Sequence, residues 1–322
     1  MKPNAQWQFG RRQWSALNRL VALTAILFVV GMSCSPGRDP ESLFAPSAGT
    51  LVVDATLIVG APMPLVYVSQ TVDASSGFDR RGAEVDSAVV TISGGTTTYP
   101  YIYVSGSGVY VPMNVGLVLP NTEYDLDVIA PDGRRVRAHT HTPAPFRVDR
   151  WVVLDDAGRH VRDLATFRAW GDSVYSRPEN QIAYATGLLE AWFQRGDAPG
   201  YQAALFSTTP NSPRLINPDF VDEADLDKLP RANSSPVLEA IDGTIRLPWL
   251  AIWFSGRYVV RVYRLDRNWY DLARSDPLVS RGGFGFGGNA GEGFDRPIFH
   301  VDGGIGLFGS AAVDSVGLVI LP

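Results

Sequence analysis

Apolar and polar residues alternate in short segments along most of the chain from Leu51 onward. Gly, Pro, Asp and Asn interrupt these segments at intervals of about ten residues, which is typical of strands in a β-sandwich or barrel. No long stretch shows the 3.6-residue period of an amphipathic helix. We therefore predict an all-β fold.

The clearest pair of strands lies on either side of Pro131-Asp132-Gly133. Residues 123–130 alternate between an acidic and an apolar face, and residues 135–142 alternate between a basic and an apolar face. The Pro-Asp-Gly sequence suits a three-residue hairpin loop that ends in a left-handed glycine. Such a loop predicts three facing pairs: Asp127 with Arg137, Asp125 with His139, and Glu123 with His141.

Other segments of the same kind predict further strands. In the first half these are Leu51–Leu57, Leu65–Thr71, Ala88–Ile92, Tyr99–Val104 and Val109–Val111. In the second half they are residues 187–193, 198–205, 244–254, 257–265 and 317–321, with a short helix at 268–273 and a polar excursion at 207–236. A helix over residues 179–195 competes with the first of these strands, although Gly187 disfavours it.

The N-terminus has the layout of an export signal. Four basic residues precede an uncharged apolar run from Leu20 to Met32, which is too short to be read as a spanning helix. Cys34, the only cysteine, follows the small residues Gly31 and Ser33 and resembles the cysteine of a bacterial lipobox. The resemblance implies a signal peptide at 1–33 and a Cys34 acylated with chains such as palmitate. A plain signal peptide or an uncleaved anchor are the alternatives.

The remaining chain divides into a tether and two domains. Residues 34–49 carry the cysteine and a spacer rich in Pro, Ser and Gly. We predict one β-sandwich over residues 50–142 and a second β-rich domain over 146–322, because Thr142-Pro143-Ala144-Pro145 forms a stiff break.

Charge and cysteine content exclude several classes. Loss of residues 1–33 removes four basic residues and no acidic one, which changes the net charge from −5 to −9. An acidic chain without basic clusters is a poor ligand for nucleic acid or anionic lipid, so membrane attachment is expected through the lipid anchor alone. With one cysteine the chain has no disulfide framework.

Several motifs carry resemblances to known families. Residues 50–142 resemble carboxypeptidase-regulatory-like or transthyretin-like domains, through Gly108-Val109-Tyr110, Pro120–Leu126 and Pro131–Arg134. Residues 187–205 resemble two strands of fibronectin-type-III-like sandwiches, which implies that Trp192 lies in the core.

The order of lipobox, two sandwiches and the glycine-rich segment 303–309 resembles a family of envelope lipoproteins known only as a domain of unknown function. Members occur beside outer-membrane transporters driven by TonB. The resemblance implies the outer membrane, and either of its faces, as the location.

Motifs for catalysis and cofactors are weak. Two stretches match G-x-G-x-x-G, at residues 283–288 and 304–309, but neither lies between a strand and a helix of a βαβ unit. The hydrolase signatures G-x-S-x-G and H-E-x-x-H do not occur. We predict no cofactor and no enzymatic activity. His139, His141 and Asp125 are weak candidates for a metal site, and cross-strand charge pairing is the favoured interpretation.

Aromatic residues give the remaining candidates for binding. Trp249, Trp253, Trp269 and Tyr270 form either a platform for sugar rings or part of the core, and their spacing favours the core. The loop 282–294 carries Phe284, Phe286 and Phe294 among glycines, which indicates contact with a partner. We predict a non-catalytic binding or scaffold lipoprotein with an envelope protein as partner. A carbohydrate-binding or hydrolytic accessory protein of glycan uptake is the alternative.

Overall fold

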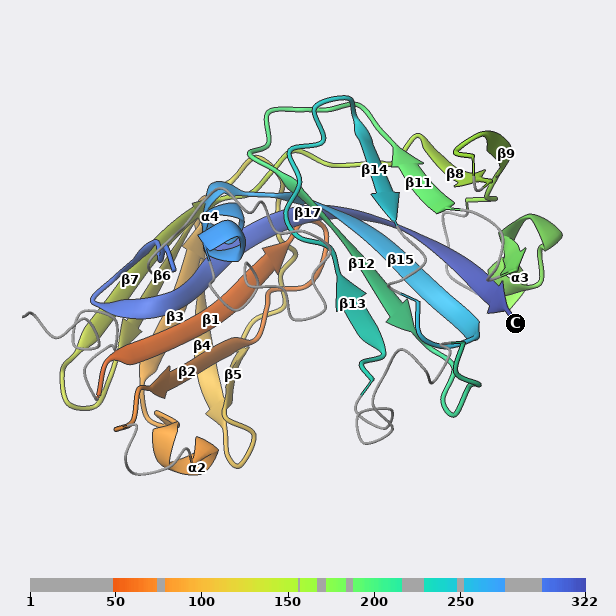
Figure 1. Cartoon of the computed structure of the whole chain (residues 1–322). Coiled ribbons are helices and arrows are strands. Elements are labelled where there is room, and N and C mark those ends of the chain that lie inside the picture. Colours follow the sequence, from red (N-terminus) through yellow and green to blue (C-terminus); the bar gives the residue numbers. More distant parts are fainter. Residues whose placement is uncertain are drawn as a thin grey trace, which may run out of the picture. The chain divides into compact units, whose positions relative to one another are not determined.

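The computed structural model describes residues 49–73, 79–155, 157–166, 172–183, 188–215, 229–247, 252–275 and 297–322, and these residues form mainly strands (Figure 1). The prediction of an all-β fold is confirmed. All described residues belong to one compact unit, Ser47–Pro322. The expected signal peptide at 1–33, Cys34 and the loop 282–294 lie outside the described residues and remain predictions. No helix of the described residues is long and apolar enough to cross a bilayer.

Seven strands and one short helix make up the first half of this unit. They are β1 (Leu51–Ile58), β2 (Val66–Gln70), α2 (Arg80–Ala83), β3 (Val89–Gly94), β4 (Thr97–Val104), β5 (Val109–Pro112), β6 (Glu123–Ile129) and β7 (Arg135–His141). Every second residue of β1 is buried, so Leu51, Val53 and Leu57 face a core that also receives Ile92 and Leu126. The five strands predicted here from sequence are all present.

Strand β4 connects two layers around this core. Its first residues pair with β3, where Pro100 faces Thr91, and its last residues pair with β5, where Tyr101 faces Pro112. Pro100 lacks a backbone N–H, and a strand tolerates proline where ladder pairing changes. The layer of β1, β2 and β5 therefore continues into the layer of β3, β6 and β7.

The hairpin of β6 and β7 has the predicted register. Glu123 faces His141, Asp125 faces His139, and Asp127 faces Arg137. Gly133 is in the left-handed region, with φ of 87°, as the three-residue loop requires. The local turn chemistry was sufficient to fix this part of the fold.

The second half contains a two-layer sandwich. Its strands are β8 (Arg150–Leu154), β9 (His160–Asp163), β10 (Gln181–Ala183), β11 (Leu188–Trp192), β12 (Tyr201–Ser207), β13 (Ala232–Ser234), β14 (Thr244–Leu247) and β15 (Gly256–Leu265), with short helices α3 (Asp172–Tyr175) and η3 (Pro178–Asn180). A four-stranded sheet in the order β14-β11-β8-β9 faces β12, β15 and the last strand across a core that includes Trp151, Tyr201 and Val260.

Two sequence expectations for this half are wrong. The alternative helix over 179–195 does not form, since β10 and β11 occupy described parts of that range. The strand expected over 244–254 ends at Leu247, and Phe254 makes only an isolated bridge with Arg214.

Helix α4 (Arg267–Ser275) covers and slightly extends the predicted helix at 268–273. Its first turn is capped by Asp266, whose Oδ1 accepts the backbone N–H of Trp269 at 2.9 Å. The other oxygen of this buried carboxylate accepts the hydroxyl of Thr140, so the cap also ties α4 to β7. Burial raises the pKa of Asp266.

The last strand is much longer than predicted. After β16 (Val301–Asp302), β17 extends over Gly304–Leu321, whereas the sequence predicted only residues 317–321. Its first half pairs in parallel with β1, and its second half pairs antiparallel with β15 (Figure 1). Gly306 has φ of 119°, and a Cβ there would lie 1.9 Å from the carbonyl oxygen of Val53. The second G-x-G-x-x-G match therefore serves close strand approach.

Two hydrophobic cores share this strand. Phe308 belongs to the core of the first half, while Val316 and Leu318 belong to the core of the second. The boundary predicted between residues 142 and 146 falls where the chain passes from one core to the other. The division into two domains remains a prediction, and β17 contributes to both proposed parts.

Candidate partner-binding surface

Large apolar side chains are exposed mainly between residues 65 and 119. Eight of them form what we call the apolar face: Leu65, Tyr67, Ile102, Val104, Met113, Val115, Leu117 and Leu119. Scattered exposed apolar residues are normal, whereas a set on adjacent strands is typical of a binding surface.

Strand register explains how the first four of these residues share one side of the sheet. Tyr67 faces Val109 on β5, and Val109 in turn faces Val104 on β4. Ile102 faces Val111 in the next row. The intervening residues, including Val66, Tyr101 and Tyr110, point the other way and are buried.

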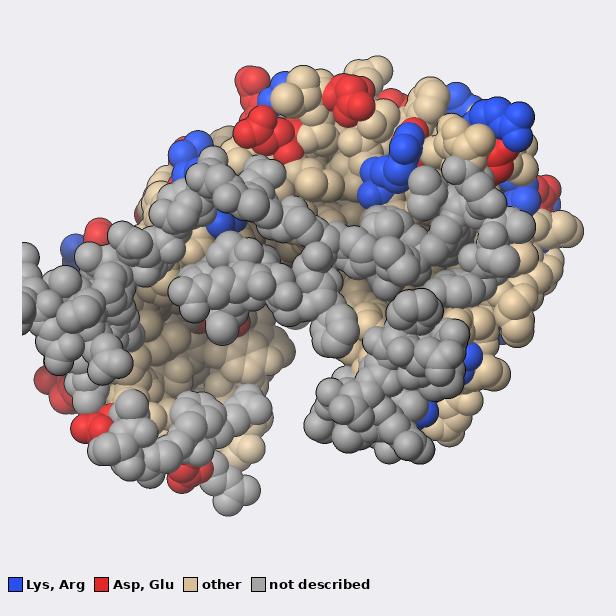
Figure 2. Space-filling view, viewed as in Figure 1, with Lys and Arg blue, Asp and Glu red and all other residues tan. Residues whose placement is uncertain are grey.

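The sequence of these strands is apolar on both sides. An antiparallel sheet that covers a core with one face commonly presents polar residues on the other. Here Tyr67 of β2 and the preceding Leu65 lie outside, whereas Val66 and Val68 of β2 lie inside. In Figure 2 the described surface over β2 and β5 is mostly free of charged side chains. This half of the sheet thus presents an outer surface suited to burial against something else.

The segment 113–119 extends the apolar face beyond the strands. The backbone N–H of Met63 donates to the carbonyl of Gly116, and that of Val118 donates to Ala61, each at 2.9 Å. These bonds hold residues 116–118 alongside residues 61–63 as an extended stretch, where side chains alternate between the two faces. Val118 is buried, whereas Val115 is 102% exposed and Leu117 is 55% exposed. The backbone bonds therefore fix the segment while its apolar side chains stay in water.

One carboxylate lies beside these residues. Asp54 on β1 faces Tyr67 of β2 on one side and Leu307 of β17 on the other. Neither of these two neighbours carries a charge that could pair with Asp54. Its side chain reaches solvent, yet the surrounding protein desolvates the carboxyl and raises its pKa. Among the residues that the structure describes, no side chain forms an ion pair or hydrogen bond with Asp54. The position is suited to accept a hydrogen bond from a partner.

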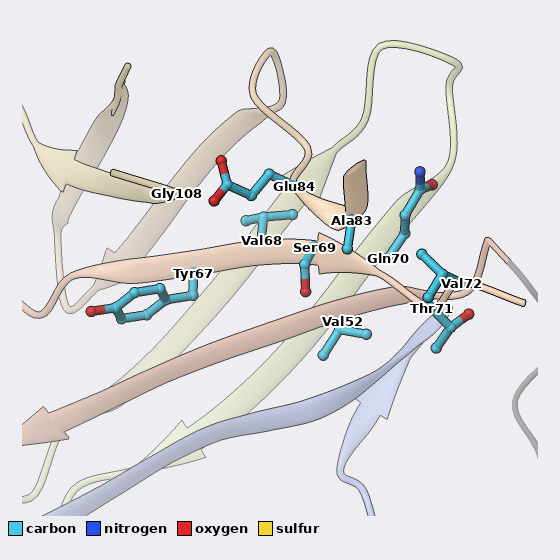
Figure 3. A pocket seen from close by; sticks show the side chains of 10 residues that line it. All are labelled: Val52, Tyr67, Val68, Ser69, Gln70, Thr71, Val72, Ala83, Glu84 and Gly108. Atoms are coloured by element: carbon cyan, nitrogen blue, oxygen red, sulfur yellow. The ribbon is translucent and has the colours of Figure 1, made fainter. Parts of the chain in front are cut away.

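A pocket of about 480 Å³ lies along β2 at the border of this face (Figure 3). Val52, Tyr67, Ser69, Val72 and Glu84 are among the residues that line it. Its volume is in the range of ligand pockets. Glu84 accepts the hydroxyl of Tyr103 at 3.0 Å, and desolvation together with this carboxylate raises the pKa of Tyr103. The apolar face is the outer surface of a sheet, and this pocket provides a concave site at its border.

The weak metal candidates lie on another surface, the outer face of β6 and β7. His139 sits between two carboxylates, with Nδ1 2.9 Å from Asp125 and Nε2 in contact with Glu123. Hydrogen bonding to Asp125 raises the pKa of His139. The side chain of His141 does not join them, and Asp127 binds Arg135 at 2.6 Å more closely than Arg137. No group of three metal-ligating side chains is found among the described residues.

The other sequence candidates are dispersed. Trp253 is 8% exposed, which confirms the core interpretation for this residue, and Trp269 is half-buried with its ring 5.5 Å from that of Tyr263. Tyr270 packs near Gly200, and Trp249 lies outside the described residues, as do Phe284, Phe286 and Phe294. The structure therefore brings together no exposed platform from Trp253, Trp269 and Tyr270.

The core position implied for Trp192 is wrong. The core of the second half is built around Trp151, which is 0% exposed, whereas Trp192 is 38% exposed on the opposite face of the same sheet. The reason is the alternation of side chains along β11. Leu189 and Ala191 point into the core, so Glu190 and Trp192 point to the other face.

Sequence reasoning also missed the apolar face. The alternating apolar residues in Met113-Asn114-Val115-Gly116-Leu117 could have indicated it, because this segment lies outside the strands expected from the sequence. Leu65, Tyr67, Ile102 and Val104 gave no such signal. Apolar residues on both faces of a strand are equally typical of a strand buried on both sides.

Comparisons with known proteins assign a family and no activity. A family model described as a domain of unknown function (DUF4249) matches residues 40–315. No curated protein is similar enough to the chain to count as a relative. The chain shows 9% identity and a TM-score of 0.19 to a solved structure of a 1.5-MDa bacterial ice-binding adhesin. That alignment covers 86% of this chain and 66% of the adhesin chain, and the TM-score is too low to carry an argument.

Proposed function

Since the chain belongs to the family described as a domain of unknown function (DUF4249), we propose from its surface that it is a non-catalytic envelope module that binds a partner protein. The observation that carries the proposal is the apolar face, whose eight large side chains lie on β2 and the residue before it, on β4 and on the segment 113–119. Burial of such area against a partner is favourable, and the interior of a protein interface is apolar.

The surface also suggests what the partner must offer. An apolar patch of the partner would cover Ile102, Val104 and Leu117. A hydrogen-bond donor, such as a Lys, Arg or hydroxyl group, would meet Asp54, because a desolvated carboxylate gains most from a donor. A membrane-embedded or periplasmic segment of an outer-membrane transporter is a partner of this kind.

We further propose that acylation of Cys34 holds the module at the outer membrane. The proposal rests on the basic, apolar and small-residue order that leads to this cysteine. Cys34→Ala should move the protein from the membrane fraction to the soluble fraction. Continued membrane association of this variant would contradict the lipid anchor and leave the partner-binding proposal intact.

The partner-binding proposal is tested by site-specific photocrosslinking in native membranes. A benzophenone amino acid at Ile102 or at Val115 should capture the same neighbouring protein. The matched control is Val161 on β9, which is apolar and 52% exposed but distant in the fold from the apolar face. No capture at Ile102 and Val115, or equal capture at Val161, would contradict the proposal.

The loop 282–294 is a second proposed contact, independent of the first. Replacing Phe284 and Phe286 with Ser should weaken partner capture and leave the melting temperature nearly unchanged. A large fall in melting temperature would show that these rings belong to the core.

A further inference from the structure

The outer face of the four-stranded sheet carries a network of charged and aromatic side chains. In one row of facing residues Arg246, Glu190, Val152 and Asp163 lie side by side, and in the next row Thr244, Trp192 and Arg150 do. In Figure 2 basic and acidic side chains mix over this part of the molecule. The network is separate from the apolar face, because it lies on another sheet.

The ring of Trp192 has one covered side and one open side. The guanidinium of Arg150 lies 5.0 Å from the ring centroid, and Asp163 holds Arg150 there through bonds of 2.8 and 2.9 Å. On the opposite strand the facing residue is Thr244, which is too small to cover a Trp ring. This explains why Trp192 remains 38% exposed although it lies on a strand with neighbours on both sides.

Glu190 fixes the geometry of the open side. This residue is 6% exposed, and its carboxylate accepts two hydrogen bonds, from Nε1 of Trp192 at 2.5 Å and from Nε of Arg246 at 2.9 Å. Nothing in the described part of the chain bonds to the two Nη atoms of Arg246, which leaves four N–H groups of this guanidinium available to a ligand. One buried carboxylate thus orients both an aromatic ring and a guanidinium.

A hydrogen-bond acceptor lies near Arg246 and Thr244. Asp242 precedes Thr244 in the turn before β14, and its Oδ1 accepts the Thr244 backbone N–H at 3.2 Å. Hydrogen bonding to Thr244 lowers the pKa of Asp242, and the positive charge of Arg246 contributes in the same direction. Arg246, which shares Glu190 with Trp192, therefore supplies donors, and Asp242, which interacts with the charge of Arg246 and precedes the Thr244 that faces Trp192, supplies an acceptor.

We propose that Trp192, Arg246 and Asp242 form a binding site for one pyranose unit of a neutral saccharide. The apolar C–H side of a sugar ring stacks on an aromatic ring, while its hydroxyl groups need both donors and acceptors around them. An acidic sugar fits less well, because Asp242, Glu190 and Asp163 already surround the site with carboxylates. This site is independent of the proposed partner-binding face, and either can fail alone.

The test is a titration of the full chain with four neutral oligosaccharides: cellohexaose, maltohexaose, laminarihexaose and chitohexaose. Indole N–H signals in NMR spectra report on Trp192 directly, and calorimetry gives the affinity. We expect at least one of the four to bind and to shift the Trp192 signal. Trp192→Ala should weaken that binding about tenfold or more, Arg246→Gln should weaken it less, and Trp192→Tyr should retain most of it.

Tyr67→Ala is the matched control, since Tyr67 is an aromatic residue with nearly the same exposure, 39%, on the apolar face. Its affinity for the saccharide should equal that of the unmodified chain. Melting curves establish that each variant is folded. Lack of binding of all four saccharides at about 5 mM, or equal binding by Trp192→Ala, would overturn the site.

Discussion

Two sheet surfaces of this molecule are built in opposite ways. The outer face of β2, β4 and β5 exposes apolar side chains that have no apolar cover among the described residues. The outer face of β8, β11 and β14 exposes charged side chains that are paired, such as Arg150 with the exposed Asp163 and Arg246 with the buried Glu190.

The difference shows what each surface still lacks. Paired charges in water have largely satisfied their interactions, so the second surface is stable as it stands, and Trp192 is the large aromatic side chain that stays exposed among its described residues. Apolar area in water gains free energy only when it is covered. The first surface therefore has more to gain from a macromolecular partner, and the second from a small polar ligand.

The largest expected change in the free energy of unfolding comes from substitutions in the two cores beneath these surfaces. Trp151→Ala and Leu126→Ala each remove a fully buried side chain, and each should lower the free energy of unfolding by about 3–5 kcal/mol. Because β17 contributes to both cores, we expect one calorimetric transition that both variants shift. Leu321→Ala, at a 40% exposed position, is the control with little effect. Two transitions, each moved by one variant only, would make the halves independent.

The next largest effect is expected where β17 packs closely against β1. Gly306→Val forces a side chain into a position with φ of 119° and against the carbonyl of Val53. We expect a loss of about 3 kcal/mol in urea unfolding. Gly60→Ala is the comparison, since Gly60 also has positive φ but open space around it, and should cost about 1 kcal/mol. Equal losses would mean that close packing of β17 against β1 is unimportant.

Two adjacent residues at the start of β2, the buried Val66 and the exposed Leu65 before it, test the contrast between the inner and outer faces. Val66→Ser places a hydroxyl in the core and should cost roughly 2–3 kcal/mol, whereas Leu65→Ser, at a 46% exposed position, should change stability by less than about 0.5 kcal/mol. Chemical denaturation of both variants measures this difference. A large loss in Leu65→Ser would show that the apolar face is already covered within the chain.

The smallest effect concerns exposed charge pairing. The pKa of His139 is raised above its ordinary value of 6.5 by Asp125, so the folded state binds its proton more tightly than the unfolded state does. The resulting stability is fully present below pH 6.5 and is lost as the pH rises through the raised value. We expect only a few tenths of a kcal/mol, because the imidazole is 57% exposed. NMR titration should show a lower His139 pKa in Asp125→Asn, and an unchanged pKa would contradict the pairing.

The sequence predicted those parts of the fold that local chemistry controls. The hairpin of β6 and β7 came out in the right register because Asp132 and Gly133 specify one loop geometry and the strands alternate cleanly. Most of β17 was missed for the opposite reason. Gly304, Gly306 and Ala311 have low strand propensity, and their partners in β1 lie about 250 residues earlier.

The candidate surfaces were missed because exposure is a tertiary property. Nothing in Ile102 or Val104 says whether a second layer covers them. Trp192 was assigned to the core by resemblance, whereas one step of register along β11 decides between core and solvent. The sequence did identify aromatic residues as the candidates for binding, and placing them required the strand pairing.

The pairing of β1 with β17 also determines when the first sheet can be completed during synthesis of the chain. A ribosome adds about 5–20 residues per second, so β1 is finished roughly 10–50 s before its parallel neighbour is made. During that time one edge of β1 has free N–H and C=O groups and an incomplete core beneath it. The sheet of the first half therefore stays incomplete until the last residues of the chain have been synthesised.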